Sequence, residues 1–278
     1  MRRALSLGRF FDVEVPAGFS GRVAYRPIPL ARRERAREYD QFRRSGIGDA
    51  GCRSSKFFLQ RTSGRLQPDF MSDTIEIHPT TPQPRLVVQV AEALADGQVA
   101  VLPTDSGYAL ACRLEDKAAL ARIAQIRRDD EPHHMTMICR DLSEISTYAK
   151  LDNVHYRFLK AHTPGPFTFI LEATSEVPRR LLHAKKRSIG LRVPQHPVLQ
   201  AIVQELRAPI LSASLVLPDL DEPLEDPDLF PKAVDRQVDL VVHCGFLVQM
   251  PSTVIDMTGP EFTLVRVGLG GVPPELED

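Results

Sequence analysis

The amino-acid sequence predicts an α/β fold, built on an open, mixed β-sheet with helices on its faces. From Met71 onward, short apolar runs typical of strands alternate with amphipathic stretches typical of helices. Some neighbouring strand runs are separated by a tight turn and others by a helix. Tight turns join antiparallel strands and helices join parallel ones, so the sheet is expected to contain both kinds of pair.

The helices are predicted by end signals as well as by apolar spacing. Thr81-Pro82 resembles an N-cap followed by proline in the first turn, and Gly97 resembles a C-cap. Asp116 is expected to cap a second helix that runs to Arg127. Further helices are predicted after Asp141 and over residues 152–161, 196–206 and 227–236.

The strands are predicted from short runs rich in β-branched and other apolar residues. They cover residues 98–103, 108–113, 135–139, 167–171, 189–193, 210–215, 238–243, 252–256 and 262–267. The acidic, proline-containing stretch 218–228 is predicted to be a surface loop.

Charge divides the chain into two regions. Residues 1–70 carry 15 lysines and arginines against 7 acids, and residues 71–278 carry 20 against 29, so net charges of +8 and −9 give the overall −1. The first region is expected to be a basic extension, disordered or loosely packed. The alternatives are a nucleic-acid-binding arm or an upstream extension without function. Residues 71–278 are expected to form the folded domain, so deleting the extension should hardly change the melting temperature.

The cysteines and the hydropathy exclude several classes of protein. The four cysteines Cys52, Cys112, Cys139 and Cys244 are far apart and form no Cys-x-x-Cys pair, so we expect neither a zinc site nor a disulfide scaffold. No apolar run approaches the roughly 18 residues of a membrane span, and the arginine-rich start lacks the apolar core of a secretory signal. A cytoplasmic protein with reduced thiols and no membrane partner is expected.

A polar turn follows the predicted strand 98–103. The run Pro103-Thr-Asp-Ser-Gly-Tyr108 contains Thr104 and Asp105, and its residue types favour a tight corner. An ordinary solvated turn has the same composition. In α/β proteins, however, ligand-binding groups gather at such strand ends.

Later segments place hydroxyl groups and arginines in similar positions. Arg192 lies inside a predicted strand with His196 at the next helix start, and Arg266 lies in a strand beside a glycine. An arginine flanked by apolar residues needs an anionic partner, which is either an internal acid or a bound anion. Guanidinium groups combined with hydroxyls and backbone N–H groups make a workable phosphate and carboxylate site.

These segments, in this order, resemble the YrdC-like domain of the threonylcarbamoyl-AMP synthase family. The pieces PTDSGYAL, TPGPFTFIL, IGLRVPQHP, SASL, PSTVID and LVRVG extend over about residues 75–270. The spellings PTDSGYAL, MICRDLSEISTYA and EVPRRLL are closest to the YciO branch. The resemblance implies a twisted, open, mixed sheet with flanking helices and a concave ligand site.

The resemblance also implies substrates and a reaction. ATP, with Mg²⁺ accompanying the nucleotide, L-threonine and bicarbonate would give threonylcarbamoyl-AMP and pyrophosphate, and partner proteins would use the adenylate to modify tRNA. The residues expected to bind the substrates are Thr104, Asp105, Tyr108, Arg127, Arg192, Ser212, Ser214, Ser252, Thr253 and Arg266. No catalytic residue is assigned, because such a reaction needs alignment and charge stabilisation more than side-chain acid–base chemistry. No metal ligand is assigned to the protein.

Two positions depart from the family's pattern. Where the family has Lys-x-Arg, this chain has Arg127-Arg128-Asp129, so the second charge is reversed. Where the family has Ser-x-Asn, the chain has Ser214-Leu215-Val216, so an amide is replaced by an apolar group. Each lost contact to phosphate is expected to weaken ATP binding by about 1–3 kcal/mol. Arg128 or the His133-His134 pair is the candidate substitute, and a solvated loop is the alternative for the histidines.

Three functions remain open from the sequence. The leading one is a threonylcarbamoyl-AMP synthase with activity weakened at the altered positions. The second is a non-catalytic protein that binds double-stranded RNA or tRNA through a basic cleft lined by Arg113, Arg127, Arg192 and Arg266. The third is ATP-dependent carbamoylation or adenylation of another substrate.

Overall fold

The computed structural model describes residues 72–128, 135–183, 186–218, 220 and 223–277. In this part of the chain, ten strands form one sheet in the order β1-β8-β2-β3-β7-β4-β6-β5-β9-β10. The strands are β1 (Asp73–Glu76), β2 (Ala100–Thr104), β3 (Gly107–Arg113), β4 (Thr136–Ile138), β5 (Phe167–Glu172), β6 (Ser188–Arg192), β7 (Ile210–Ser214), β8 (Leu240–His243), β9 (Thr253–Asp256) and β10 (Thr263–Arg266). The helices are α2 (Pro84–Ala95), α3 (Lys117–Arg127), α4 (Leu142–Tyr148), α5 (Asn153–His162), α6 (Pro197–Leu206) and α7 (Lys232–Asp235).

The sheet is open and mixed, as the sequence predicts. The pairs β1–β8, β2–β8, β4–β6 and β5–β9 are parallel. The pairs β2–β3, β3–β7, β4–β7, β5–β6 and β9–β10 are antiparallel. Strands far apart in the sequence therefore become neighbours, and the polar ends of β2, β6 and β9 are brought into one sheet.

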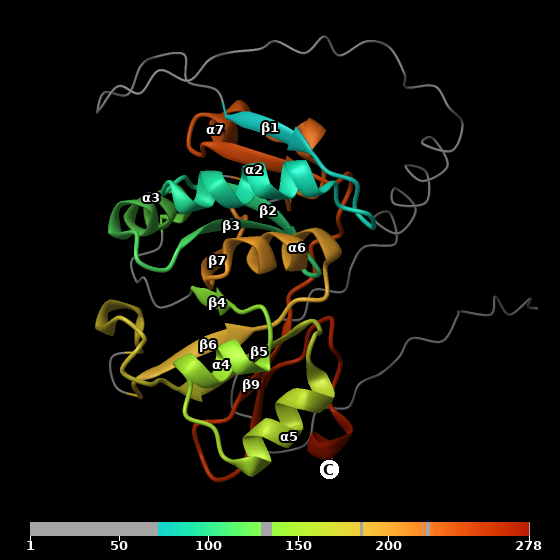
Figure 1. Cartoon of the computed structure of the whole chain (residues 1–278). Coiled ribbons are helices and arrows are strands. Elements are labelled where there is room, and N and C mark those ends of the chain that lie inside the picture. The colour runs from blue at the N-terminus through green and yellow to red at the C-terminus, as the bar shows by residue number, and fades with distance from the viewer. Residues whose placement is uncertain (1–71, 129–134, 184–185, 219, 221–222, 278) are drawn as a thin grey trace, which may run out of the picture.

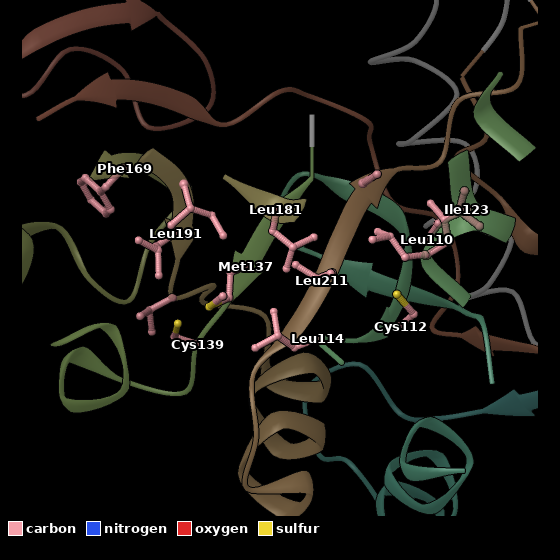
Figure 2. Packing of buried hydrophobic residues seen from close by; sticks show 14 of the residues in the cluster. Leu110, Cys112, Leu114, Ile123, Met137, Cys139, Phe169, Leu181, Leu191 and Leu211 are labelled. Atoms are coloured by element: carbon pink, nitrogen blue, oxygen red, sulfur yellow. The ribbon is translucent and has the colours of Figure 1, made fainter. Parts of the chain in front are cut away.

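Two hydrophobic clusters hold the helices on the sheet. Val90 of α2 and Ile202 of α6 pack with Leu102 of β2 in one cluster, and Figure 1 shows these two helices lying across the same end of the sheet. The larger cluster joins α3 and α5 to the other face of the strands. Figure 2 shows its residues along neighbouring strands, with Leu110 on β3, Leu211 on β7, Met137 on β4 and Leu191 on β6.

Most predicted elements are present, and the caps explain where several of them start. Asp116 caps α3 by accepting hydrogen bonds from the N–H groups of Ala118 and Ala119, as predicted. The expected cap at Thr81-Pro82 is wrong. The N–H of Thr81 donates to Nδ1 of His78 at 3.1 Å, so Thr81 belongs to the preceding turn, and α2 begins at Pro84.

Two further elements differ from the prediction. The helix predicted over 227–236 is divided, because Pro231 lacks an N–H group and separates a short 3₁₀ turn at Pro227–Leu229 from α7. Strand β1 was missing from the prediction. Its four residues, Asp-Thr-Ile-Glu, show no strand pattern by themselves, and their register comes from pairing with β8. Cys112, Cys139 and Cys244 are free and buried, and Cys52 lies outside the described residues.

Candidate functional site

One face of the sheet changes from apolar to polar along its width. Under α2 and α6 this face presents side chains such as Leu102 and Ile210. Because side chains alternate along a strand, Ser212 and Ser214 share the face of Ile210. Cross-strand partners continue the same face into β4, β6 and β5. We call the polar continuation the polar strip; it consists of Thr136, Thr168, Gly190, Arg192, Ser212 and Ser252.

Gly190 lies between two hydroxyl-bearing residues of the strip. A Cβ at this glycine would lie 3.4 Å from Cγ2 of Thr168 and 3.7 Å from Oγ1 of Thr136. The absence of a side chain therefore leaves the backbone of β6 open between two threonines. A backbone kept open in this way permits the close approach of a bound group.

Arg192 is the buried cation of the strip. Its Nη2 pairs with Oδ1 of Asp105, and its Nη1 donates to Oγ of Ser106 at 2.8 Å. The second carboxylate oxygen of Asp105 accepts a hydrogen bond from the N–H of Gln195 at 3.1 Å. From the sequence, the partner of Arg192 could be an internal acid or a bound anion. The structure shows that it is an internal acid, Asp105. The Nε–H group of Arg192 is buried and has no hydrogen-bond partner in the described structure.

Arg266 brings a second guanidinium group to the same region. Its Nε and Nη2 donate to the carbonyl oxygen of Ser252 at 3.1 and 3.0 Å. The hydroxyl of Ser252 lies 2.8 Å from that of Thr168 on the neighbouring strand. Burial, and then the positive charge of Arg266, lower the pKa of Arg192 from 12.5 to about 10. Both arginines remain charged at neutral pH, and two cations held near each other favour a bound anion.

Two predicted residues, Thr104 and Tyr108, already bond within the protein, and Tyr108 packs in the larger hydrophobic cluster, on the face opposite the strip. Oγ1 of Thr104 donates to the carbonyl of Gly107 at 2.7 Å and accepts from the N–H of Ser106 at 3.0 Å, which fixes the β2–β3 turn. The hydroxyl of Tyr108 donates to Gly245 O at 2.6 Å, and the residue is 1% exposed. Tyr108 therefore joins β3 to the loop after β8.

Thr253 fixes the chain near the C-terminus. Its hydroxyl donates to the carbonyl of Gly271 and accepts from the N–H of Gly268, both at 3.0 Å. A Cβ at Gly268 would lie 2.2 Å from the carbonyl oxygen of Pro251, so only glycine allows this approach. The segment that carries Arg266 is thereby held against the start of β9.

Of the remaining predicted residues, Ser212 belongs to the strip, and Ser214 and Arg127 lie at its margin. The hydroxyl of Ser212 donates to Thr136 O at 3.3 Å, whereas Ser214 is exposed. The guanidinium group of Arg127, at the end of α3, donates to the carbonyl of Ser214. Asp129, His133 and His134 lie outside the described residues.

The basic cleft predicted from four arginines does not form as expected. Arg113 lies at the far end of β3, and its Nη1 donates to the carbonyl of Ala95 at the end of α2, at 2.8 Å. Arg113 therefore faces away from the turn that holds Asp105. The reason is the length of β3, which carries seven residues from Gly107 to Arg113.

Sequence reasoning missed four residues of this region: Ser106, Thr136, Thr168 and Gly190. Ser106 and Thr168 lie inside segments that had been singled out, Pro103–Tyr108 and Thr163–Thr168. Strand alternation alone would have placed Thr168 opposite Phe167 and Phe169, on the polar side. Thr136 and Gly190 have no comparable signal, because their pairing depends on the parallel register of β4 and β6.

A small acidic cluster lies elsewhere on the surface. Side-chain ligand atoms of Asp226, Asp228 and His243 lie within 4.8 Å of one another. Nδ1 of His243 accepts a hydrogen bond from the N–H of Gly245 at 3.0 Å, so Nε2 carries the ring proton and lies 3.2 Å from Asp228 Oδ1. A metal ion would need the lone pair of that same nitrogen. We assign no metal to this cluster.

The sequence of the strands that carry the strip matches known proteins. The Sua5/YciO/YrdC family model, described as telomere recombination, matches residues 92–268. YciO of Escherichia coli (strain K12) is 50% identical over 206 residues, which make up 74% of this chain and 100% of that relative. The chain belongs to the Sua5/YciO/YrdC family. Within the family it is of the YciO branch.

Solved structures agree with this placement. The crystal structure of E. coli YciO matches with a TM-score of 0.69 and 50% identity, covering 73% of this chain and 99% of that one. P. abyssi Sua5 complexed with L-threonine has the same fold, with a TM-score of 0.64 and 20% identity, over 71% of this chain and 58% of that one.

A more distant relative of this family member carries a named activity. Threonylcarbamoyl-AMP synthase of Vibrio vulnificus (strain YJ016) is 27% identical over 129 residues, which are 45% of this chain and 69% of the relative.

In the described parts of the chain, no helix is both long and apolar enough to cross a bilayer.

Proposed function

We propose that this YciO-branch protein is an ATP-dependent enzyme that makes threonylcarbamoyl-AMP from ATP, L-threonine and bicarbonate. The observation that carries the proposal is the approach of Arg192 and Arg266 beside the hydroxyls of Thr168 and Ser252. All three substrates are anionic or carry a carboxylate, so a pair of cations with neighbouring hydroxyl donors suits them. The distant likeness to a threonylcarbamoyl-AMP synthase supports the choice of substrates.

The proposed chemistry balances without a redox step. The amine of threonine condenses with bicarbonate, with loss of water, and forms a carbamate. A carbamate oxygen then attacks the α-phosphorus of ATP, the bond from that phosphorus to the bridging oxygen breaks, and pyrophosphate leaves. Mg²⁺ would accompany the nucleotide and offset its charge.

The strip and the adjoining Arg266 would contribute alignment and charge. Arg192 is anchored by Asp105 and Ser106, so its unused Nε–H can donate to an anion with little loss of side-chain freedom. Arg266 is fixed by Ser252 and would face charge that grows on the phosphoryl group. The open backbone at Gly190 would admit the ligand between Thr136 and Thr168.

The altered positions would weaken nucleotide binding. Arg127 donates to the carbonyl of Ser214, which occupies part of its guanidinium group. Val216 is 46% exposed and offers no hydrogen bond. The adenylate would pass to proteins that modify tRNA, which suits a cytoplasmic enzyme.

The direct test is product formation by the purified full-length protein. The protein is incubated with Mg²⁺, ATP, L-threonine and labelled bicarbonate, and label in an AMP adduct is followed by mass spectrometry together with pyrophosphate. We expect adduct and pyrophosphate in equal amounts, and none when threonine is omitted. Adduct formed with other amines but not with threonine would identify a different substrate. Failure of ATP to bind, with retention of a double-stranded RNA probe, would favour the non-catalytic function.

A further inference from the structure

A separate cavity lies between α3 and the segment around α7. It has a volume of about 650 Å³ and lies at the edge of the fold, where Figure 1 shows α3 and α7 at the same end of the sheet. Its apolar lining includes Ala118 and Ala121 of α3 and Leu217 from the segment after β7. A volume of this size suits a small organic molecule. None of its lining residues is among the ten predicted substrate-binding residues, although Arg128 is the candidate substitute for a lost contact to ATP.

The charged side chains that line this cavity in the described structure are all positive. Arg122, Arg128 and Arg236 line it, and no carboxylate is among its described lining residues. Arg122 is paired with Asp239 at 2.6 Å, and Arg236 is exposed. The charge of the lining therefore favours an anionic group at the rim and excludes a cationic ligand.

Gln237 adds a specific requirement. It lines the cavity, and its side-chain oxygen is buried without a hydrogen-bond partner in the described structure. A buried acceptor without a partner is unfavourable, by about 1–3 kcal/mol. A ligand with an N–H or O–H donor would remove that penalty.

We propose that this cavity is a second ligand site, for a small organic anion with an apolar body and one hydrogen-bond donor. The apolar body lies against Ala118, Ala121 and Leu217, the anionic group faces Arg236, and the donor reaches Gln237. Arg127, the last residue of α3, holds the carbonyl of Ser214 at the margin of the polar strip. Helix α3 therefore borders both the cavity and the margin of the strip.

Anilinonaphthalenesulfonate is a probe with this chemistry, since it has an aromatic body, one sulfonate and one N–H group. N-phenylnaphthylamine is the matched neutral probe that lacks the sulfonate. Fluorescence titration of the full chain should give saturable binding of both probes, with the sulfonate bound more tightly. Arg236→Glu should weaken the sulfonate by about tenfold and leave the neutral probe nearly unchanged. Gln237→Met should weaken both.

A variant whose side chain fills the cavity gives a stricter test of probe binding. Ala121 is exposed, so Ala121→Trp can fold while its ring occupies the space, and Ala121→Ser is the size-matched control. We expect probe binding to be lost in the tryptophan variant and kept in the serine variant. Val265→Thr alters another exposed apolar position, on β10, and should have no effect. Three results would each overturn the proposal. They are probe binding kept in Ala121→Trp, probe binding lost in Val265→Thr, and the same affinity for the sulfonate probe in Arg236→Glu and wild type.

Discussion

Arg192 of β6 and Asp105 of the β2–β3 turn form an ion pair between residues that are 87 positions apart in the chain. Both side chains are largely buried, with 8% and 13% exposed. Asp105 neutralises the charge of Arg192 and fixes its position, while the Nε–H group keeps its capacity to donate. Arg266 adds a positive charge that Asp105 does not balance. This arrangement would allow a structural ion pair and the proposed ligand site to share one arginine.

Gly190 provides a test of ligand access that is separate from stability. In Gly190→Ala, the new Cβ meets its nearest neighbour at 3.4 Å, which is ordinary van der Waals contact. We expect the unfolding free energy to change by less than about 1 kcal/mol, while ATP and threonine bind more weakly because the strip is narrowed. Urea unfolding and calorimetric titration on the same variant separate these effects.

Gly268→Ala is the matched control for that substitution. Its Cβ would lie 2.2 Å from Pro251 O, so the backbone must shift and stability should fall by about 1–3 kcal/mol. Equal destabilisation by both variants would show that Gly190 has a packing role only.

Strand and helix positions followed from the sequence because each depends on local signals. Asp116 predicted the start of α3 by its capping chemistry, and it accepts hydrogen bonds from the first turn of that helix. Asp152 caps α5 in the same way, although that helix was predicted from its apolar spacing. Strand β1 carried no such signal, since its position depends on pairing with β8 across more than half of the chain.

The sequence predicted which kinds of residue form the candidate site better than it predicted their arrangement in space. Arg192 and Arg266 were recognised because charged residues in apolar strands need partners. Tyr108 has no such signal, and only the tertiary structure shows that its hydroxyl joins Gly245 and Cys244. The contributions of Thr136 and Gly190 depend on strand register, which is set by long-range pairing.

The folded domain should not need the basic extension. Removing residues 1–70 is expected to leave the melting temperature within a few degrees of the full chain, because the sheet and both hydrophobic clusters lie within residues 72–277. A relative matched over its whole length by 206 residues of this chain supports the same view. Differential scanning calorimetry of both proteins checks this. A larger drop would show that the extension packs on the domain.

His196 should make stability depend on pH. Burial lowers its pKa from 6.5 to about 4, and its Nδ1 is buried without a partner. Between these two pKa values the unfolded chain binds more protons than the folded protein. The unfolding free energy therefore has its full value above pH 6.5 and decreases as the pH falls toward 4.

The size of that effect can be measured by urea unfolding. From pH 7 to pH 5, His196 should account for a loss of about 2 kcal/mol in unfolding free energy. In His196→Gln this part of the pH dependence should disappear. A variant with the same pH profile as wild type would assign the effect to other groups.

Restoring the family's side chains should improve nucleotide binding. We expect Asp129→Arg together with Val216→Asn to tighten ATP binding by about 1–3 kcal/mol, since a repulsive charge is removed and a hydrogen-bonding amide is added. Calorimetric titration of Mg²⁺-ATP into both proteins measures the change. Equal or weaker binding in the double variant would mean that other residues already serve the phosphates, or that the site takes another ligand.

The most direct test of the polar strip is titration of Mg²⁺-ATP, with L-threonine present, into wild type, Arg192→Met and Arg266→Met. Lys160→Met removes one positive charge at an exposed position of α5 and is the matched control. Circular dichroism and thermal melts first establish that each variant is folded. We predict that both arginine variants bind at least about tenfold more weakly, while Lys160→Met binds like wild type. Wild-type affinity in both arginine variants would contradict the assignment of this strip as the substrate site.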